Sequence, residues 1–174
     1  KIKVNEMDVP WFSLLRKGVF RHALDSAHAQ FAESTIFGKM LDQVERDTIL
    51  RQFKGIRLEG VTRFYPIPEK LVLPHQHNHI TIHFKGIDTD QAQQLQYQYQ
   101  LEGYDKAWSQ PSKITSAVLG NISAGQYTFK VRLRRGNEEW SAPISYNFRV
   151  LPPWYSSWWA YAAYALLFWA SLRT

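Results

Sequence analysis

The sequence predicts a mainly β protein, a two-layer antiparallel sandwich with a helical segment before it and a helix after it. Three observations lead to this fold class. Short segments within residues 56–150 alternate apolar and polar side chains and are separated by Gly, Pro, Asn and Asp, which is the pattern of antiparallel strands. Apolar residues before this region recur at helical spacing, and residues 154–172 contain no charged side chain. We therefore divide the chain into residues 1–53, 54–151 and 152–174.

Residues 1–53 are expected to be helical. Apolar side chains recur three and four residues apart, at Leu24, Ala27, Phe31, Phe37, Met40, Leu41 and Val44. Charged residues such as Asp42 and Arg46 fall on the other side of this pattern. A helix pair that packs against the rest of the protein or against a second copy explains the pattern, because a nucleic-acid recognition helix would need a basic face.

Residues 54–151 show the alternation of a sandwich. Ile80, Ile82 and Phe84 fall on one face of a strand, and residues 97–101, 127–133 and 146–150 repeat the pattern. Further strands are expected at 56–64, 69–73 and 114–119. About seven strands in about 95 residues is the density of a fibronectin-III or immunoglobulin-like β-sandwich. Tyr127 follows a turn at 121–126, so its hydroxyl is placed to bond upstream backbone, as in a tyrosine corner.

Several sequence blocks in this region resemble a known family. Residues 97–108 read YQYQLEGYDKAW, residues 124–132 read AGQYTFKVR, and Trp140 with Ser141 and the Pro152-Pro153-Trp154 sequence follow in order. Over roughly residues 54–164 the chain resembles the Y_Y_Y domain of bacterial two-component sensors. That module lies between periplasmic β-propeller repeats and a transmembrane helix that leads to a histidine kinase.

The resemblance implies a fibronectin-like sandwich in the periplasm, a homodimer, and a parent protein with an upstream sensing domain and a downstream kinase. Neither the sensing repeats nor the kinase is present in these residues, so no residue here can be assigned to ligand specificity or phosphotransfer. Aromatic residues of the family blocks are expected to keep the sandwich rigid: Tyr97, Tyr99, Tyr104, Trp108, Tyr127 and Trp140. If Trp108 or Trp140 were exposed, it could instead stack on a sugar.

The C-terminal segment is predicted to start a transmembrane helix. Its nineteen uncharged residues, 154–172, would be about 28 Å long as a helix, close to the thickness of the bilayer core. Trp154, Trp158, Trp159 and Tyr161 are expected at the membrane interface. A helix packed on the sandwich or on a second subunit is the alternative. The ends of the chain suggest a segment cut from a longer protein of the bacterial inner membrane.

A histidine cluster is the one metal-like feature of the sequence. It comprises His75, His77, His79 and His83. Imidazoles at alternate positions of a strand could bind zinc, nickel or copper. Pro74 and Asn78 suggest that the first two histidines lie in a turn, and no cysteine or carboxylate accompanies the cluster. We therefore expect surface histidines, and neither a metal nor a cofactor.

No catalytic constellation is present in the sequence. The chain has no cysteine, which excludes thiol nucleophiles and thiolate metal sites. It also lacks a G-x-S-x-G elbow, a glycine-rich phosphate loop and an H-E-x-x-H motif. We expect this segment not to be an enzyme, although a full-length parent would be a histidine kinase.

A row of basic residues follows one predicted strand, at Lys130, Arg132, Arg134 and Arg135. An anionic glycan, a phospholipid head group or a partner carboxylate could bind this row, but the outer face of a sheet is commonly charged. The net charge is +6 without a long basic run, so no nucleic-acid partner is expected.

The predicted function is an extracytoplasmic module that couples an upstream ligand-sensing domain to a transmembrane helix in a two-component sensor kinase. The physical reason is that no Gly/Ser linker separates the last strand from Pro152, so a movement of the sandwich would reach the helix. The alternative is a fibronectin-like accessory module that binds a glycan or a protein partner.

Overall fold

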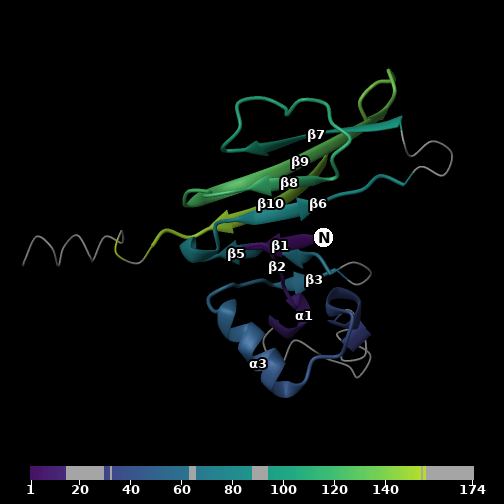
Figure 1. Cartoon of the computed structure of the whole chain (residues 1–174). Helices are drawn as coiled ribbons and strands as arrows, with labels where there is room; N and C mark the ends of the chain where they lie inside the picture. Colours follow the sequence, from purple (N-terminus) through teal and green to yellow (C-terminus); the bar gives the residue numbers. More distant parts are fainter. Residues whose placement is uncertain (15–29, 32, 63–65, 88–93, 154, 156–174) are drawn as a thin grey trace, which may run out of the picture.

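The computed structural model describes residues 1–14, 30–31, 33–62, 66–87, 94–153 and 155, and their main feature is a pair of four-stranded sheets (Figure 1). The first, sheet A, has the strand order β2-β1-β6-β8. Its strands are β1 (Ile2–Val4), β2 (Met7–Asp8), β6 (Ile80–His83) and β8 (Ser116–Leu119). The second, sheet B, has the order β5-β10-β9-β7. Its strands are β5 (Leu71–Leu73), β10 (Ile144–Val150), β9 (Gly125–Arg135) and β7 (Leu95–Glu102).

Neighbouring strands of both sheets are antiparallel, except that β5 runs parallel to β10. The short strands β3 (Gly60–Val61) and β4 (Pro68–Glu69) form a separate ribbon before β5. Arg57 bridges to Val72 on the free side of β5, and Ser112 bridges to Tyr97 on the free side of β7. Both edges of sheet B are therefore covered by neighbouring chain.

The hydrophobic core lies between the two sheets. Ile2, Ile80 and Leu119 of sheet A belong to the same buried cluster as Leu71, Phe129 and Val150 of sheet B. Aromatic rings fill the space within it, for example Tyr99 stacked on Phe129 at 5.9 Å and Tyr127 stacked on Phe148 at 5.7 Å between centroids. The prediction of a mainly β protein is confirmed, and its layers are those of a sandwich.

The expected strands lie close to those observed, with one informative difference. Residues 69–73 were expected to be one strand, but Lys70 has a φ of +50° and separates β4 from β5. A left-handed residue interrupts the pleat of a strand, because the alternation of side chains depends on extended backbone. Of the expected strand 56–64, only Gly60 and Val61 are paired in the described residues.

The prediction that residues 1–53 are helical is wrong for the first eight residues. They form β1 and β2, and β1 pairs with β6 in the middle of sheet A. Ile2 and Val4 are buried while Lys3 between them is not, so a three-residue alternation was enough to make a strand. The pattern was too short to stand out in the sequence, and pairing with β6 decides it.

Helices appear after this hairpin: α1 (Trp11–Leu14), a helical stretch at 33–37, and α3 (Gln43–Gln52). Asp42 and Glu45 form a capping box at the start of α3, which satisfies free backbone N–H groups there. Trp11 and Phe53, at the ends of this region, are buried in the main core. The predicted apolar stripe is only partly used, because Phe31, Met40 and Val44 are exposed.

The chain leaves the sandwich at the end of β10. Leu151 N–H donates a hydrogen bond to the carbonyl of Leu73, at 2.8 Å, so the residues after β10 stay attached to β5. Most of the predicted C-terminal helix, including Trp154, Trp158, Trp159 and Tyr161, lies outside the described residues. Within the described part of the chain, no helix has the length and apolar character to cross a membrane.

Candidate functional site

The turn between β1 and β2 has an unusual backbone. Asn5 and Glu6 both have left-handed φ angles, +50° and +62°. A two-residue hairpin needs such angles, but glycine is the usual residue there because a Cβ atom costs free energy in this conformation. Contacts from elsewhere in the fold must therefore hold this turn.

Those contacts come from the segment that leads into β6. Asn5 N–H donates to the carbonyl of His79 at 2.8 Å, and its side-chain amide lies 3.0 Å from Nδ1 of His77. Glu6 Oε1 accepts from the Thr81 hydroxyl at 2.9 Å and lies 2.8 Å from Nε2 of His79. The hydrogen bonds from Thr81 and then His79 lower the pKa of Glu6, so the contact involves the carboxylate.

The segment that holds the hairpin is a short 3-10 helix, η1 (His75–His77), which connects β5 to β6. We call residues 75–79 the histidine turn. His77 is 6% exposed, and its ring packs on Phe53 with 6.0 Å between centroids. Burial lowers the pKa of His77, against a smaller opposite effect of a hydrogen bond with the backbone of Gln52. The ring is therefore neutral at pH 7, and Nδ1 can accept from the Asn5 amide.

The histidine turn also touches the chain that leaves the sandwich. His75 packs edge-on against Tyr155, with 6.3 Å between ring centroids. The strand before the turn, β5, accepts the Leu151 N–H at the carbonyl of Leu73. One short segment therefore contacts the N-terminal hairpin on one side and the residues after β10 on the other.

The four histidines do not converge on one point. His75 contacts Tyr155, His77 is buried under the hairpin, and His79 pairs with Glu6. His83 lies at the far end of β6, and burial followed by nearby positive charge lowers its pKa. Among the described residues, no group of three or more His, Cys, Asp or Glu side chains is arranged to hold a metal ion.

The predicted structural tyrosines differ in their surroundings. The Tyr127 hydroxyl donates to the Ser123 carbonyl at 3.0 Å, which is the expected tyrosine-corner hydrogen bond. The Tyr97 hydroxyl accepts from Gly86 N–H at 3.1 Å, and Tyr99 stacks on Phe129. Tyr104, by contrast, is 61% exposed in the turn after β7, so its ring adds little to the core.

Sequence reasoning did not single out Tyr146 of β10, although it has a similar hydrogen bond. Its hydroxyl donates to the carbonyl of Pro68 at 2.8 Å and joins β10 to the β3–β4 ribbon. Burial raises the pKa of Tyr146 well above its ordinary value. Sequence reasoning also missed Asn5 and Glu6. The only signal for their turn is a polar pair between short apolar runs, and the glycine that commonly marks a hairpin is absent from it.

Trp108 and Trp140 pack on arginines at the outer face of sheet B, the face turned away from the core. The Arg132 guanidinium lies 4.1 Å from the ring centroid of Trp108 and 4.9 Å from that of Trp140. Arg134 lies 4.6 Å from the Trp140 ring. The sequence suggested a structural role or sugar stacking for these tryptophans, and the structure brings them onto the basic row of β9.

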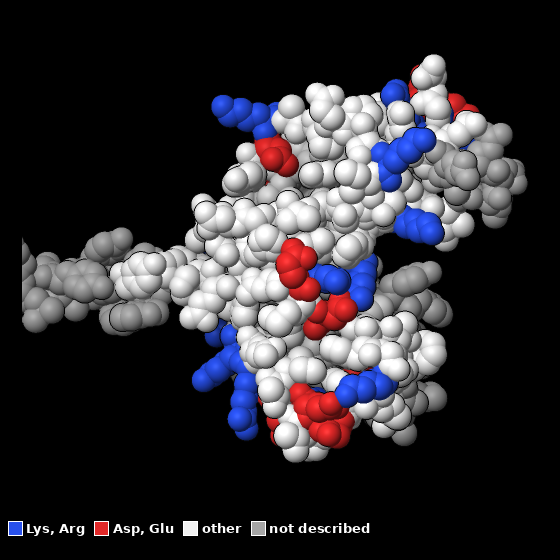
Figure 2. All heavy atoms as spheres, viewed as in Figure 1, with Lys and Arg blue, Asp and Glu red and all other residues white. Residues whose placement is uncertain are grey.

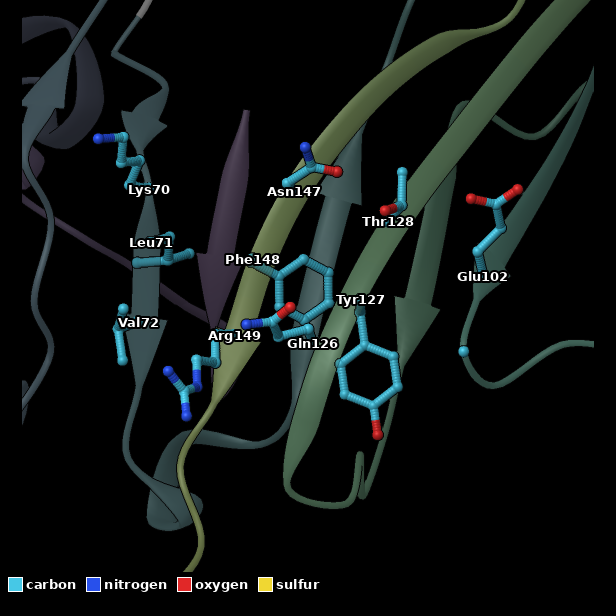
Figure 3. A pocket seen from close by; sticks show the side chains of 11 residues that line it. Lys70, Leu71, Val72, Glu102, Gln126, Tyr127, Thr128, Asn147, Phe148 and Arg149 are labelled. Carbon is cyan, nitrogen blue, oxygen red and sulfur yellow. The ribbon is translucent and has the colours of Figure 1, made fainter.

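A shallow pocket of about 530 Å³ lies at the other end of the same face. Figure 3 shows that its polar side chains come from neighbouring strands: Gln126 and Thr128 from β9, Asn147 and Arg149 from β10, and Glu102 from β7. In the view of Figure 2, some acidic and basic side chains lie side by side, other basic side chains stand apart from acidic ones, and no single broad basic surface is seen.

Two facing sheets make the described part of the chain a β-sandwich, and its tyrosine-corner hydrogen bond is one that immunoglobulin-like sandwiches also have. Residues 88–151 match the model of the Y_Y_Y domain family. The match is shorter than the expected 54–164. It contains β7, β8, β9 and β10, while β1, β2, β5 and β6 lie before it. The two sheets are thus completed by residues outside the family match.

This chain matches only a small part of the length of its known relatives. The chain is 36% identical over 75 residues to "Histidine kinase P4" of Formosa agariphila, which is 41% of this chain and 5% of the relative. Two solved structures from B. thetaiotaomicron are also similar. The extracellular domain of the hybrid two component system BT3049 is 26% identical, with a TM-score of 0.44, over 56% of this chain and 14% of that one. The extracellular domain of BT4673 is 24% identical, with a TM-score of 0.40, over 52% and 13%.

Proposed function

We propose that this segment is the signal-transmitting module of a two-component sensor kinase and couples an upstream ligand-sensing domain to a transmembrane helix. The observation that carries this proposal is the histidine turn, which contacts the N-terminal hairpin and Tyr155. The Y_Y_Y match at residues 88–151 and the relative named as a histidine kinase support the class of protein.

The coupling would act through a stiff connection. The hairpin at Asn5 and Glu6 is held by contacts with the histidine turn. A displacement of the chain before β1 would therefore be transmitted directly to this turn. The same turn packs against Tyr155 through His75, and β5 accepts a hydrogen bond from Leu151 N–H. Packed elements pass on such shifts because interiors resist compression. Pro152 and Pro153 then limit bending beyond Leu151.

We place the sandwich in the periplasm and the segment after Pro153 at the inner membrane, with Trp154, Trp158, Trp159 and Tyr161 at the lipid interface. We also propose a homodimer, an upstream sensing domain and a downstream kinase in the parent protein. In this arrangement the segment itself carries out no chemistry. Its aromatic residues, Tyr97, Tyr99, Tyr127 and Trp108 above all, would give the sandwich the rigidity of a lever.

Hydrogen exchange on residues 1–174 tests the coupling. An Asn5→Gly variant keeps the left-handed turn, which glycine tolerates, and removes the amide that contacts His77. We expect faster exchange at the His77 amide, which bonds to Pro74, and also at the Leu151 amide, which bonds to Leu73. The expected pattern is a change at both sites, since the turn connects them.

Lys3→Ala is the matched control, because Lys3 lies in the same hairpin with its side chain away from the core. It should leave exchange at His77 and Leu151 as in the unaltered chain. If Asn5→Gly accelerates exchange at His77 alone, or at neither amide, the histidine turn does not couple the hairpin to the end of β10, and the transmission route is refuted.

A further inference from the structure

Arg132 and Arg134 have uncommon partners. Gln98 Oε1 accepts from Nε and Nη2 of Arg132 at 3.1 and 2.8 Å, and Gln96 Oε1 accepts from Nε of Arg134 at 3.0 Å. With the tryptophan rings, these contacts fix both guanidinium groups in place. Neutral amides and aromatic faces orient an arginine without cancelling its charge. Both guanidinium groups are therefore oriented and keep their positive charge, so they can bind an anion.

Several other surface cations, unlike this pair, have a carboxylate partner. Lys1, Lys39, Lys70, Lys130 and Arg135 each form an ion pair with a carboxylate. Among the described residues, Arg132, Arg134 and Arg149 have no carboxylate within ion-pair distance. All three project from the outer face of sheet B, as the register of β9 with β7 and β10 shows. Three cations without an ion-pair partner among the described residues therefore share this face.

The remainder of this face is rich in neutral polar groups. Gln100, Gln126, Thr128, Ser145 and Asn147 lie on it, and the pocket of Figure 3 occupies the end near Arg149. Amides and hydroxyls both donate and accept hydrogen bonds. From Gln126 to Arg134 the face extends for about 27 Å at the rise of a β-strand. It offers a long row of hydrogen-bonding groups with cations at both ends and the Lys130–Glu102 ion pair between them.

From this arrangement we infer that the outer face of sheet B binds an anionic polysaccharide. Sugar hydroxyls match the amide and hydroxyl rows, and carboxylate or sulfate groups match Arg132, Arg134 and Arg149. The edges of sheet B are already paired with residues 57 and 109–112, so an acidic peptide could not be recognised by strand addition. A second copy of this basic face would be repelled. This inference does not depend on the proposed signalling role.

Affinity electrophoresis of residues 1–174 in gels that contain polygalacturonate tests the inference. The unaltered chain should be retarded by polygalacturonate and not by neutral dextran. An Arg132→Gln and Arg134→Gln double variant should bind about tenfold more weakly or worse, since each lost arginine removes a charge-assisted contact. Thermal unfolding of the same variant shows whether it is folded. Arg149→Gln, at the far end of the face, should independently weaken binding to polygalacturonate.

The matched control is an Arg51→Gln and Lys54→Gln double variant, which removes the same charge at the end of α3, on the opposite side of the molecule from β7 in Figure 1. It should keep full retardation. Equal losses in the two double variants would show non-specific attraction and overturn the inference. Retardation by polyglutamate as strong as that by polygalacturonate, or no retardation by polygalacturonate, would overturn it as well.

Discussion

Tyr127 shows how a single hydroxyl can fix a corner of the sandwich. Its ring is buried on Phe148, and the hydroxyl bonds the Ser123 carbonyl. Gly125 leaves room for it, since a Cβ atom there would lie 3.3 Å from the tyrosine hydroxyl. The corner therefore depends on a small residue and a polar atom in the positions that the sequence places next to the turn.

We expect Tyr127→Phe to lower the free energy of unfolding by about 1 to 3 kcal/mol, because the Ser123 carbonyl loses its partner. Urea unfolding measures the difference. Tyr104→Phe is the control, since the Tyr104 side chain is exposed, and it should have little effect. Equal stability of the Tyr127→Phe variant and the unaltered chain would show that the hydroxyl does not support the corner.

His77 predicts a pH dependence at the same scale. Burial lowers its pKa in the folded protein, so below the ordinary histidine pKa of about 6.5 the unfolded chain binds more protons than the folded one. Stability should therefore be full above that pH and fall as the pH decreases towards 5. The His77→Gln variant should lose less stability at low pH than the unaltered chain, as measured by thermal unfolding. Part of the loss should remain, because the pKa of His83 is lowered as well. A pH dependence unaltered by His77→Gln would contradict the assignment.

At the scale of elements, the N-terminal hairpin is the decisive addition to the fold. Strand β1 supplies Ile2 and Val4 to the core and pairs with β6, and the residues after it bury Trp11. Without β1, the backbone of β6 would be an open edge, which sheets rarely leave unprotected. The hairpin is therefore part of the sandwich, although it lies far from the family match in the sequence.

Two substitutions in β1 test this role. Val4 is fully buried, so Val4→Ala should reduce the free energy of unfolding by about 2 kcal/mol. Lys3→Ala, one residue away on the opposite face, should change it little. If urea unfolding gives the same small effect for both, β1 is not packed in the core and the boundary expected near residue 53 stands.

At the scale of the whole molecule, the proposed function requires the chain after β10 to anchor the sandwich. We expect residues 1–174 to partition into membranes and to form a dimer in detergent, whereas a chain that ends at Val150 should be monomeric and remain in solution. Membrane flotation and sedimentation measure these properties. Identical behaviour of the two chains would remove the anchor from the proposal and leave the sandwich as a binding module.

The sequence by itself determined the strands of residues 80–150 and the tyrosine corner. In these strands, alternation over several residues fixes which side chains face the core, because the pleat of a strand has a period of two. The blocks around Tyr97 and Tyr127 were also sufficient to identify the family, since their order does not depend on contacts.

Only the tertiary structure decided the role of the N-terminal hairpin, the histidine turn and the arginine–tryptophan stack. Asn5 and His77, like Arg132 and Trp108, are distant in sequence and meet because separate strands pair in a particular register. The left-handed Asn5 and Glu6 are tolerated because those distant contacts compensate their cost. Such contacts depend on the closing of loops, and a local pattern carries no information about which loops will close.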